Sequence, residues 1–170
     1  ALFYEIDDWA NNSNGQVWVL IPSVSRTAST QIWMYYGNPG VLENISKPEY
    51  TFNTSNGFQG VWHLNETVGD EQTSGTHYDA TFNANDGSQY RNDDAAGIIS
   101  RSQYFDGNDY INVGNKASLK ISSQITLSTW VRLSVDPGNN YWYSVMGKQN
   151  WDYNMYLWGE SDTLTTLAFD

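Results

Sequence analysis

The stretch that decides the fold is residues 106–113, Asp-Gly-Asn-Asp-Tyr-Ile-Asn-Val. Its first half is a turn signal of aspartate, glycine and asparagine, and its second half is rich in the β-branched and aromatic residues that favour strands. We predict a strand here and in each further run of this character. These runs are residues 16–21 (QVWVLI), 31–36 (QIWMYY), 60–64 (GVWHL), 125–133 (ITLSTWVRL), 141–146 (YWYSVM), 155–158 (MYLW) and 163–169 (TLTTLAF).

Helical periodicity is missing from the sequence. No window of about 11 residues places apolar residues at positions i, i+3, i+4 and i+7. Residues 48–52 are a weak helix candidate and are too short for a regular helix. Turn-forming residues separate the apolar runs, for example at residues 37–40 (GNPG) and 136–139 (DPGN). The pattern predicts an all-β chain that folds as an antiparallel β-sandwich, or jelly roll.

Composition excludes several classes of protein. Apolar residues make up 39% of the 170 residues and aromatic residues 15%, so the chain can build a core as a disordered chain cannot. The net charge of −11, from 8 basic and 19 acidic residues, repels nucleic acid. With no cysteine, disulfide frameworks, thiolate metal sites and cysteine nucleophiles are excluded. No apolar run approaches the roughly 18 residues of a membrane-spanning helix.

The chain divides, on its sequence, near residues 53–59, where Asn-Thr-Ser-Asn-Gly interrupts the aromatic pattern. The part that follows resembles the concanavalin A-like, laminin-G-like jelly-roll modules. Four segments carry the resemblance in the family's order: residues 60–66 (GVWHLNE), 73–82 (TSGTHYDATF), 104–113 (YFDGNDYINV) and 125–133, with a tryptophan of the buried type at Trp130. The resemblance implies a jelly roll over residues 60–170, preceded by a small β module over residues 1–59.

The first part is similar to a domain of unknown function, the DUF2341 family. Residues 4–6 (YEI), 16–22 (QVWVLIP) and above all 32–39 (IWMYYGNP) carry this similarity. Such domains often stand directly before jelly rolls in large prokaryotic surface proteins. The DUF2341 family normally has strands ahead of Tyr4, and the jelly-roll family continues past the position of Asp170. We therefore expect a fragment of a larger extracellular protein, in which another strand completes residues 163–169.

Aromatic residues concentrate between residues 141 and 158. Exposed rings stack on sugar faces, so we predict carbohydrate contacts from four of them: Trp142, Trp151, Tyr153 and Trp158. The competing interpretation is that these rings form cross-strand pairs in a core or pack against another module. Trp142 stands between Tyr141 and Tyr143, and a strand cannot bury three consecutive rings on one face.

Oxygen ligands are abundant in the connecting segments. Many members of the jelly-roll family bind a structural calcium ion, and calcium prefers several carboxylate and carbonyl oxygens in flexible loops. The candidate ligands are Asn65, Asp70, Asp79 and Asp106, with Asp109 close by. No EF-hand spacing is present, and residues 106–109 are explained equally well by a tight turn.

The sequence contains few arrangements of residues that are suited to catalysis. Glu5 and Asp7 point to the same side of a strand and resemble part of the E-x-D-x-x-E signature of concanavalin A-like glucanases, but the third position is Ala10. We expect a solvated acidic edge here. His63 and His77 are the only histidines, and we interpret His63 as a residue on a strand face or rim. We therefore assign no catalytic residue.

Four N-x-Ser/Thr sequons occur, at Asn11, Asn44, Asn53 and Asn65. Their number is close to chance for a chain so rich in asparagine, serine and threonine, so it is no evidence of glycosylation. Asn44 and Asn53 lie in polar connections and are the expected acceptors in a glycosylating cell.

Two functions from different classes remain open. The chain is either an extracellular carbohydrate-binding or adhesive module whose partner is a polysaccharide or glycan, or a structural subunit or spacer that contacts neighbouring modules of a surface layer or filament. A glycoside hydrolase ranks third because the sequence shows no complete carboxylate set. Fold resemblance alone does not identify a ligand.

Overall fold

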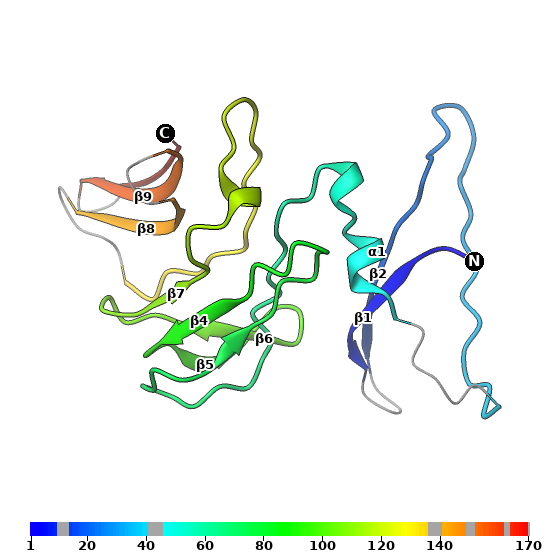
Figure 1. Cartoon of the computed structure of the whole chain (residues 1–170), viewed down its shortest axis with the longest axis horizontal. Coiled ribbons are helices and arrows are strands. Elements are labelled where there is room, and N and C mark those ends of the chain that lie inside the picture. Colours follow the sequence, from blue (N-terminus) through cyan, green and yellow to red (C-terminus); the bar gives the residue numbers. More distant parts are fainter. Residues whose placement is uncertain (10–13, 41–45, 136–140, 149–151, 162–163, 170) are drawn as a thin grey trace. The chain divides into compact units, whose positions relative to one another are not determined.

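The computed structural model describes residues 1–9, 14–40, 46–135, 141–148, 152–161 and 164–169. Within them the chain is all-β with little helix, which confirms the predicted class (Figure 1). The strands are β1 (Tyr4–Trp9), β2 (Gly15–Val19), β3 (Thr76–His77), β4 (Gly87–Tyr90), β5 (Asp93–Ala96), β6 (Arg101–Tyr104), β7 (Tyr110–Asn112), β8 (Trp142–Gly147), β9 (Asn154–Ser161) and β10 (Leu164–Phe169). The helical turns are α1 (Pro48–Thr51), η1 (Thr54–Asn56) and η2 (Ala117–Leu119). No helix of the described residues is long and apolar enough to cross a membrane.

Contacts divide the chain into two compact units, residues 1–120 and residues 121–170. The predicted division near residues 53–59 lies inside the first unit. A break between two modules at that point stays a prediction, because contacts within one unit do not exclude a boundary between families.

The first unit contains three small antiparallel sheets, with strand orders β1-β2, β3-β4-β7 and β5-β6. The β1–β2 hairpin pairs Glu5 with Trp18, and its register shifts between Ile6 and Asp8. An isolated antiparallel bridge joins Trp62 to Asp79. That bridge is the only pairing of the predicted strand at residues 60–64 within the described part of the chain.

The second unit contains one antiparallel sheet with strand order β10-β9-β8. The strands β8, β9 and β10 fall on the predicted runs 141–146, 155–158 and 163–169, of which residue 163 lies outside the described part of the chain. β10 pairs with β9 along its length, so it has a partner within its own unit and lies at the edge of that sheet.

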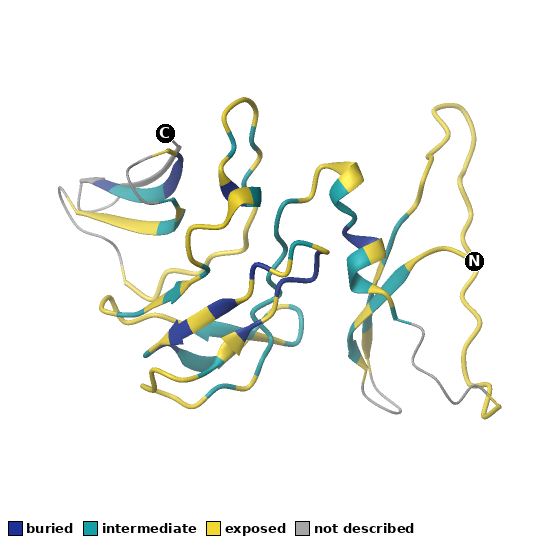
Figure 2. Ribbon diagram, viewed as in Figure 1, coloured by how far each residue is buried: buried dark blue, intermediate teal, exposed yellow. Residues whose placement is uncertain are grey.

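Two predicted strands are absent. Residues 31–36 and 125–133 have no strand pairing, and residues 21–40 are exposed throughout (Figure 2). Trp130, expected to be buried, is 88% exposed. A β-branched and aromatic composition favours a strand but does not form one, because the backbone N–H and C=O groups also need a neighbouring strand.

Polar residues occupy much of the interior. The fully buried large side chains are those of His77, Asn85 and Asn92. An aromatic cluster accompanies them in the first unit, where Phe52 contacts Trp18, Phe58 and His63 with ring centroids 5.8, 5.4 and 5.5 Å away. Buried polar groups are costly unless paired, so this interior depends on its hydrogen bonds.

Candidate functional site

Glu5 and Asp7 face inward from β1. Their alternation with Ile6 places both carboxylates on one side of the strand, and their side chains are only 12% and 2% exposed. Glu5 Oε2 lies 2.9 Å from His63 Nε2, and Asp7 Oδ2 lies 3.6 Å from His63 Nδ1. The expectation of a solvated acidic edge is therefore wrong, because the fold brings a histidine 58 positions away onto this face.

His63 is held between acidic and aromatic groups. Its ring stacks on Trp18 with a centroid distance of 5.7 Å. Burial lowers the pKa of His63, but the hydrogen bond to Glu5 and the charges of Glu5, Asp7 and Glu66 raise it further, so the net pKa lies above its ordinary value. The imidazolium is thus the form that this environment favours.

Asp7 is fixed by neutral donors as well. The Trp18 indole Nε1 donates to Asp7 Oδ2 at 2.9 Å, and the Asn65 amide donates to Asp7 Oδ1. Both oxygens of this carboxylate are engaged, so it orients the groups around it and has little freedom to move.

These groups line an open cleft of about 230 Å³, which we call the acidic cleft. It is smaller than the roughly 300 Å³ at which pockets for drug-sized ligands begin. It is lined by Glu5, Ile6, Asp7, Pro48, His63, Asn65, Glu66, Tyr78, Asp79 and Ala80. Among these residues there is no lysine or arginine, so the cleft is acidic apart from His63.

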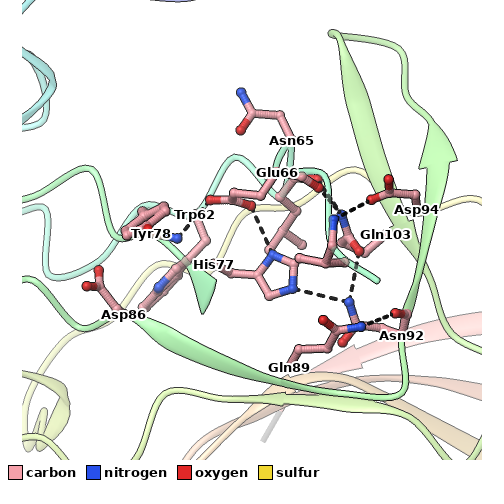
Figure 3. A network of polar contacts seen from close by, with 12 residues as sticks. Trp62, Asn65, Glu66, His77, Tyr78, Asp86, Gln89, Asn92, Asp94 and Gln103 are labelled. Atoms are coloured by element: carbon pink, nitrogen blue, oxygen red, sulfur yellow. Dashed lines mark hydrogen bonds and ion pairs between the residues drawn. The ribbon is translucent and has the colours of Figure 1, made fainter. Parts of the chain in front are cut away.

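A polar network around the buried His77 includes Glu66, which also lines the acidic cleft (Figure 3). Glu66 Oε2 accepts from His77 Nδ1 at 2.9 Å, and Glu66 Oε1 accepts from the backbone N–H of Tyr78 at 2.7 Å. On the other side of the His77 ring, Asn92 Nδ2 lies 3.2 Å from Nε2 and also donates to Gln103 Oε1 at 2.8 Å. Because an amide nitrogen can only donate, His77 Nε2 accepts from Asn92, and His77 Nδ1 is the nitrogen that donates to Glu66.

Burial raises the pKa of Glu66, but its hydrogen bonds from His77 and from the Tyr78 backbone outweigh this and leave the net pKa below its ordinary value. Glu66 therefore stays ionised in this position. The network fixes one side of the cleft through a carboxylate that is already satisfied.

An exposed aromatic group adjoins the same chain segments. Phe3 stacks on Tyr50 at 4.9 Å, and Tyr50 meets Phe82 edge-on at 5.0 Å. The three residues are 48%, 39% and 52% exposed, respectively. We call Phe3, Tyr50 and Phe82 the aromatic patch.

The predicted calcium ligands are engaged in separate structural roles. Asp79 accepts four hydrogen bonds of 2.9–3.0 Å, from the backbone N–H groups of Val61, Thr81 and Asn85 and from the Thr81 hydroxyl. Asp70 accepts from the backbone N–H of Asp94.

Asn65 and Asp106 complete the predicted set. Asn65 donates to Asp7 in the acidic cleft, whereas Asp106 belongs to the turn at residues 106–109. There Asp106 accepts weakly from Asn108, and its own N–H donates to Asp109 Oδ2.

One group of three carboxylates has oxygens within 4.8 Å of one another in the described residues: Glu71, Asp106 and Asp109. Only Asp106 belongs to the predicted calcium set. The Arg91 guanidinium already bonds to Glu71, and the Glu71 and Asp109 charges raise the pKa of Arg91. A cation would compete with Arg91 for Glu71 here, and the calcium site stays a prediction.

The predicted sugar-binding aromatics are only partly brought together. Trp142 lies opposite Trp158 in the β8–β9 ladder and meets Trp158 and Tyr156 edge-on at 6.1 and 5.8 Å. Trp142 is 54% exposed, whereas Tyr153 is buried, so Tyr153 cannot present its ring to a sugar. Trp151 lies outside the described residues. The competing cross-strand interpretation thus describes part of this set.

Two of the predicted glycosylation acceptors, Asn11 and Asn44, lie outside the described residues. Asn53 caps η1 by accepting from the backbone N–H of Ser55 at 2.8 Å. Asn65 is half-buried and its Nδ2, the atom that carries a glycan, donates to Asp7. The structure therefore disfavours glycosylation at Asn65.

Sequence reasoning missed the acidic cleft as a unit. The spacing of Glu5 and Asp7 placed both on one strand face, which was a usable signal. Nothing local to His63 pointed to β1, because its partners stand 56 and 58 positions away along the chain.

Residues 1–94 match the model of a family described as a domain of unknown function (DUF2341). The match covers more than half of the chain, which therefore belongs to the DUF2341 family. No curated protein and no solved structure matches the chain. The family match confirms the similarity seen in residues 4–39 and extends into β5, so it includes every residue that lines the acidic cleft. The resemblance of residues 60–170 to the jelly-roll modules stays a prediction.

Proposed function

We propose that this chain is a carbohydrate-binding or adhesive module of an extracellular surface protein and that the acidic cleft holds a sugar. The observation that carries the proposal is the acidic cleft itself, in which carboxylates, an amide and an imidazole converge beside the exposed ring of Tyr78. Sugars offer hydroxyl groups to polar side chains and an apolar ring face to aromatic ones. A volume of about 230 Å³ suits one sugar ring better than a larger ligand.

The polar groups of the cleft divide into fixed and available ones. Both oxygens of Asp7, Glu66 and Asp79 accept hydrogen bonds from the protein. For Glu5, one oxygen is bonded to His63, which leaves the other for a ligand hydroxyl. The exposed Tyr78 ring lies at the same cleft and offers the apolar contact.

This division favours binding over hydrolysis. Glycoside hydrolysis requires two carboxyl groups, one on each side of the scissile bond. In the acidic cleft only Glu5 keeps an oxygen without a protein partner among the described residues, so a second reactive carboxylate is lacking. We therefore expect the chain to bind glycans without cleaving them.

Trp142 and Trp158 supply a second candidate surface for the same function. Their edge-on contact in the β8–β9 sheet leaves Trp142 half-exposed, as a stacking residue requires. This surface belongs to the second unit and is assayed separately from the cleft.

A glycan array probed with the 170-residue chain tests the function. We expect retention on neutral or amino-bearing glycans, and a shift of the Trp18 indole N–H resonance on addition of the soluble form, because Trp18 donates to Asp7 beside the ligand. Tyr78→Ala should abolish the shift if the cleft is the site, whereas Trp142→Ala should remove retention if the second surface is. Tyr104→Ala, an exposed tyrosine outside both surfaces, is the matched control. Absence of retention on every glycan would overturn the proposal.

The alternative, a structural subunit or spacer of a surface assembly, is favoured by a different observation. Residues 32–36 (IWMYY) form an exposed apolar segment without strand pairing, and exposed apolar stretches mark interaction sites. Light scattering distinguishes this function: association that Trp33→Ser with Tyr35→Ser abolishes would support it, and a monomer at high concentration would contradict it.

A further inference from the structure

We propose that the aromatic patch is the platform for the second sugar of a glycan whose terminal sugar occupies the acidic cleft. This inference rests on the proposed glycan-binding function and adds to it the minimum length of the ligand, which is two sugars. It assigns Phe3, Tyr50 and Phe82 to the binding surface, although none of them lines the cleft.

The aromatic patch is built from three of the four chain segments that line the acidic cleft. Phe3 precedes Glu5 on the way into β1, and Tyr50 follows the cleft residue Pro48 within α1. Phe82 follows the cleft residue Ala80. All three segments belong to the first unit, and each ring of the patch stands two positions along the chain from a residue that lines the cleft.

Hydrogen bonds hold the first two of these segments together, and the ring contact of Tyr50 with Phe82 joins the third to them. The N–H of Lys47, which directly precedes α1, donates to Tyr4 O at 2.7 Å, and the N–H of Ile6 donates to the Ser46 hydroxyl at 3.0 Å. The Ala80 N–H donates to Val61 O at 2.8 Å. The rings are therefore positioned before a ligand arrives, which lowers the entropic cost of binding.

The patch is uncharged and about half-exposed, whereas the cleft is acidic. An apolar protein partner that covered the patch and the cleft would bury the Glu5 oxygen that has no protein partner among the described residues, which is unfavourable. A glycan avoids this conflict, because its hydroxyl or amino groups pair with carboxylates and its ring faces stack on aromatic side chains. The acidic charge further selects a neutral or cationic sugar over an anionic one.

Titration calorimetry with two β-1,4-linked series, each of one to four sugars, tests the proposal. One series is glucose with its cello-oligosaccharides, and the other is glucosamine with its chitosan oligosaccharides, which add a cationic amine at the same linkage. We expect affinity to rise about fivefold or more from one sugar to two and little beyond three. Tyr50→Ala and Phe82→Ala should remove this rise and leave the affinity for the single sugar unchanged.

Tyr50→Leu separates stacking from folding, because leucine keeps apolar packing and removes the aromatic face. In Tyr50→Leu the affinity should no longer increase from one sugar to two, while the melting temperature stays close to that of the parent chain. In Tyr104→Ala the affinity should still increase from one sugar to two. An affinity that does not increase with length, or an increase that survives in Tyr50→Leu and Phe82→Ala, would overturn the platform while leaving the glycan-binding function standing. Failure of both series to bind at millimolar concentration would overturn the platform, and the glycan array then decides the proposed function separately.

Discussion

His63 Nε2 and Glu5 Oε2 lie 2.9 Å apart and connect β1 to the segment that leads toward β3. Because both side chains are largely buried, the contact is shielded from solvent more than a surface ion pair would be. The charge on His63 therefore links the pH of the medium to the stability of the acidic cleft.

Raising the pH should weaken the fold through His63. Its folded pKa lies above the ordinary 6.5, so the stabilisation is fully present below that value and is lost as the pH rises through the folded pKa. Urea midpoints measured across this range should fall with increasing pH. His63→Gln should flatten that dependence, and a variant with the same slope as the parent chain would contradict the assignment.

Lowering the pH should weaken the fold through Glu66. Its folded pKa lies below the ordinary 4.5, so its stabilisation is present above 4.5 and is lost as the pH falls through the folded pKa. Glu66→Gln should cost about 1–3 kcal/mol at neutral pH, because an amide offers one acceptor oxygen where both His77 and Tyr78 need one. Chemical denaturation at pH 7 and pH 4 measures this, and an equal loss at both would argue against a role for the charge.

Asp79→Ala should be among the most destabilising single substitutions in the first unit. It leaves three backbone N–H groups and the Thr81 hydroxyl without their acceptor, at a cost of about 3 kcal/mol or more. Asp70→Ala, which removes one exposed contact, is the control and should cost about 1 kcal/mol or less. Similar losses in the two variants would show that Asp79 does not organise its loop.

Calcium should leave the melting temperature unchanged. Ligand binding to the native state alone stabilises by about 2.7 kcal/mol at a hundredfold excess over Kd, which thermal melts in calcium and in chelator readily resolve. We expect superimposable curves because Asp79 is saturated and Arg91 pairs with Glu71. A calcium-dependent shift that Asp106→Asn abolishes would instead restore the metal site implied by the jelly-roll resemblance.

The all-β class and the positions of several strands could be predicted, because side-chain alternation and turn-forming residues are local features of the sequence. β2, β7, β8, β9 and β10 all fall on apolar runs. The polar strands β4, β5 and β6 gave no such signal, since residues such as Asp93 and Gln103 are stabilised by hydrogen bonds to distant groups. For residues 31–36 and 125–133 the composition predicted strands that the structure does not contain. A strand requires a neighbouring strand, which composition does not reveal.

The sequence by itself determined the all-β class, the acidic charge and the placement of Glu5 and Asp7 on one face of a strand. Only the tertiary structure decided that this face meets His63, Trp18 and Asn65 to form a cleft, and that Asp79 accepts four hydrogen bonds from other residues. The physical reason is that side-chain alternation follows from the backbone of one strand, whereas a site requires groups far apart in sequence to be brought together. That approach depends on packing and hydrogen bonds across the whole first unit.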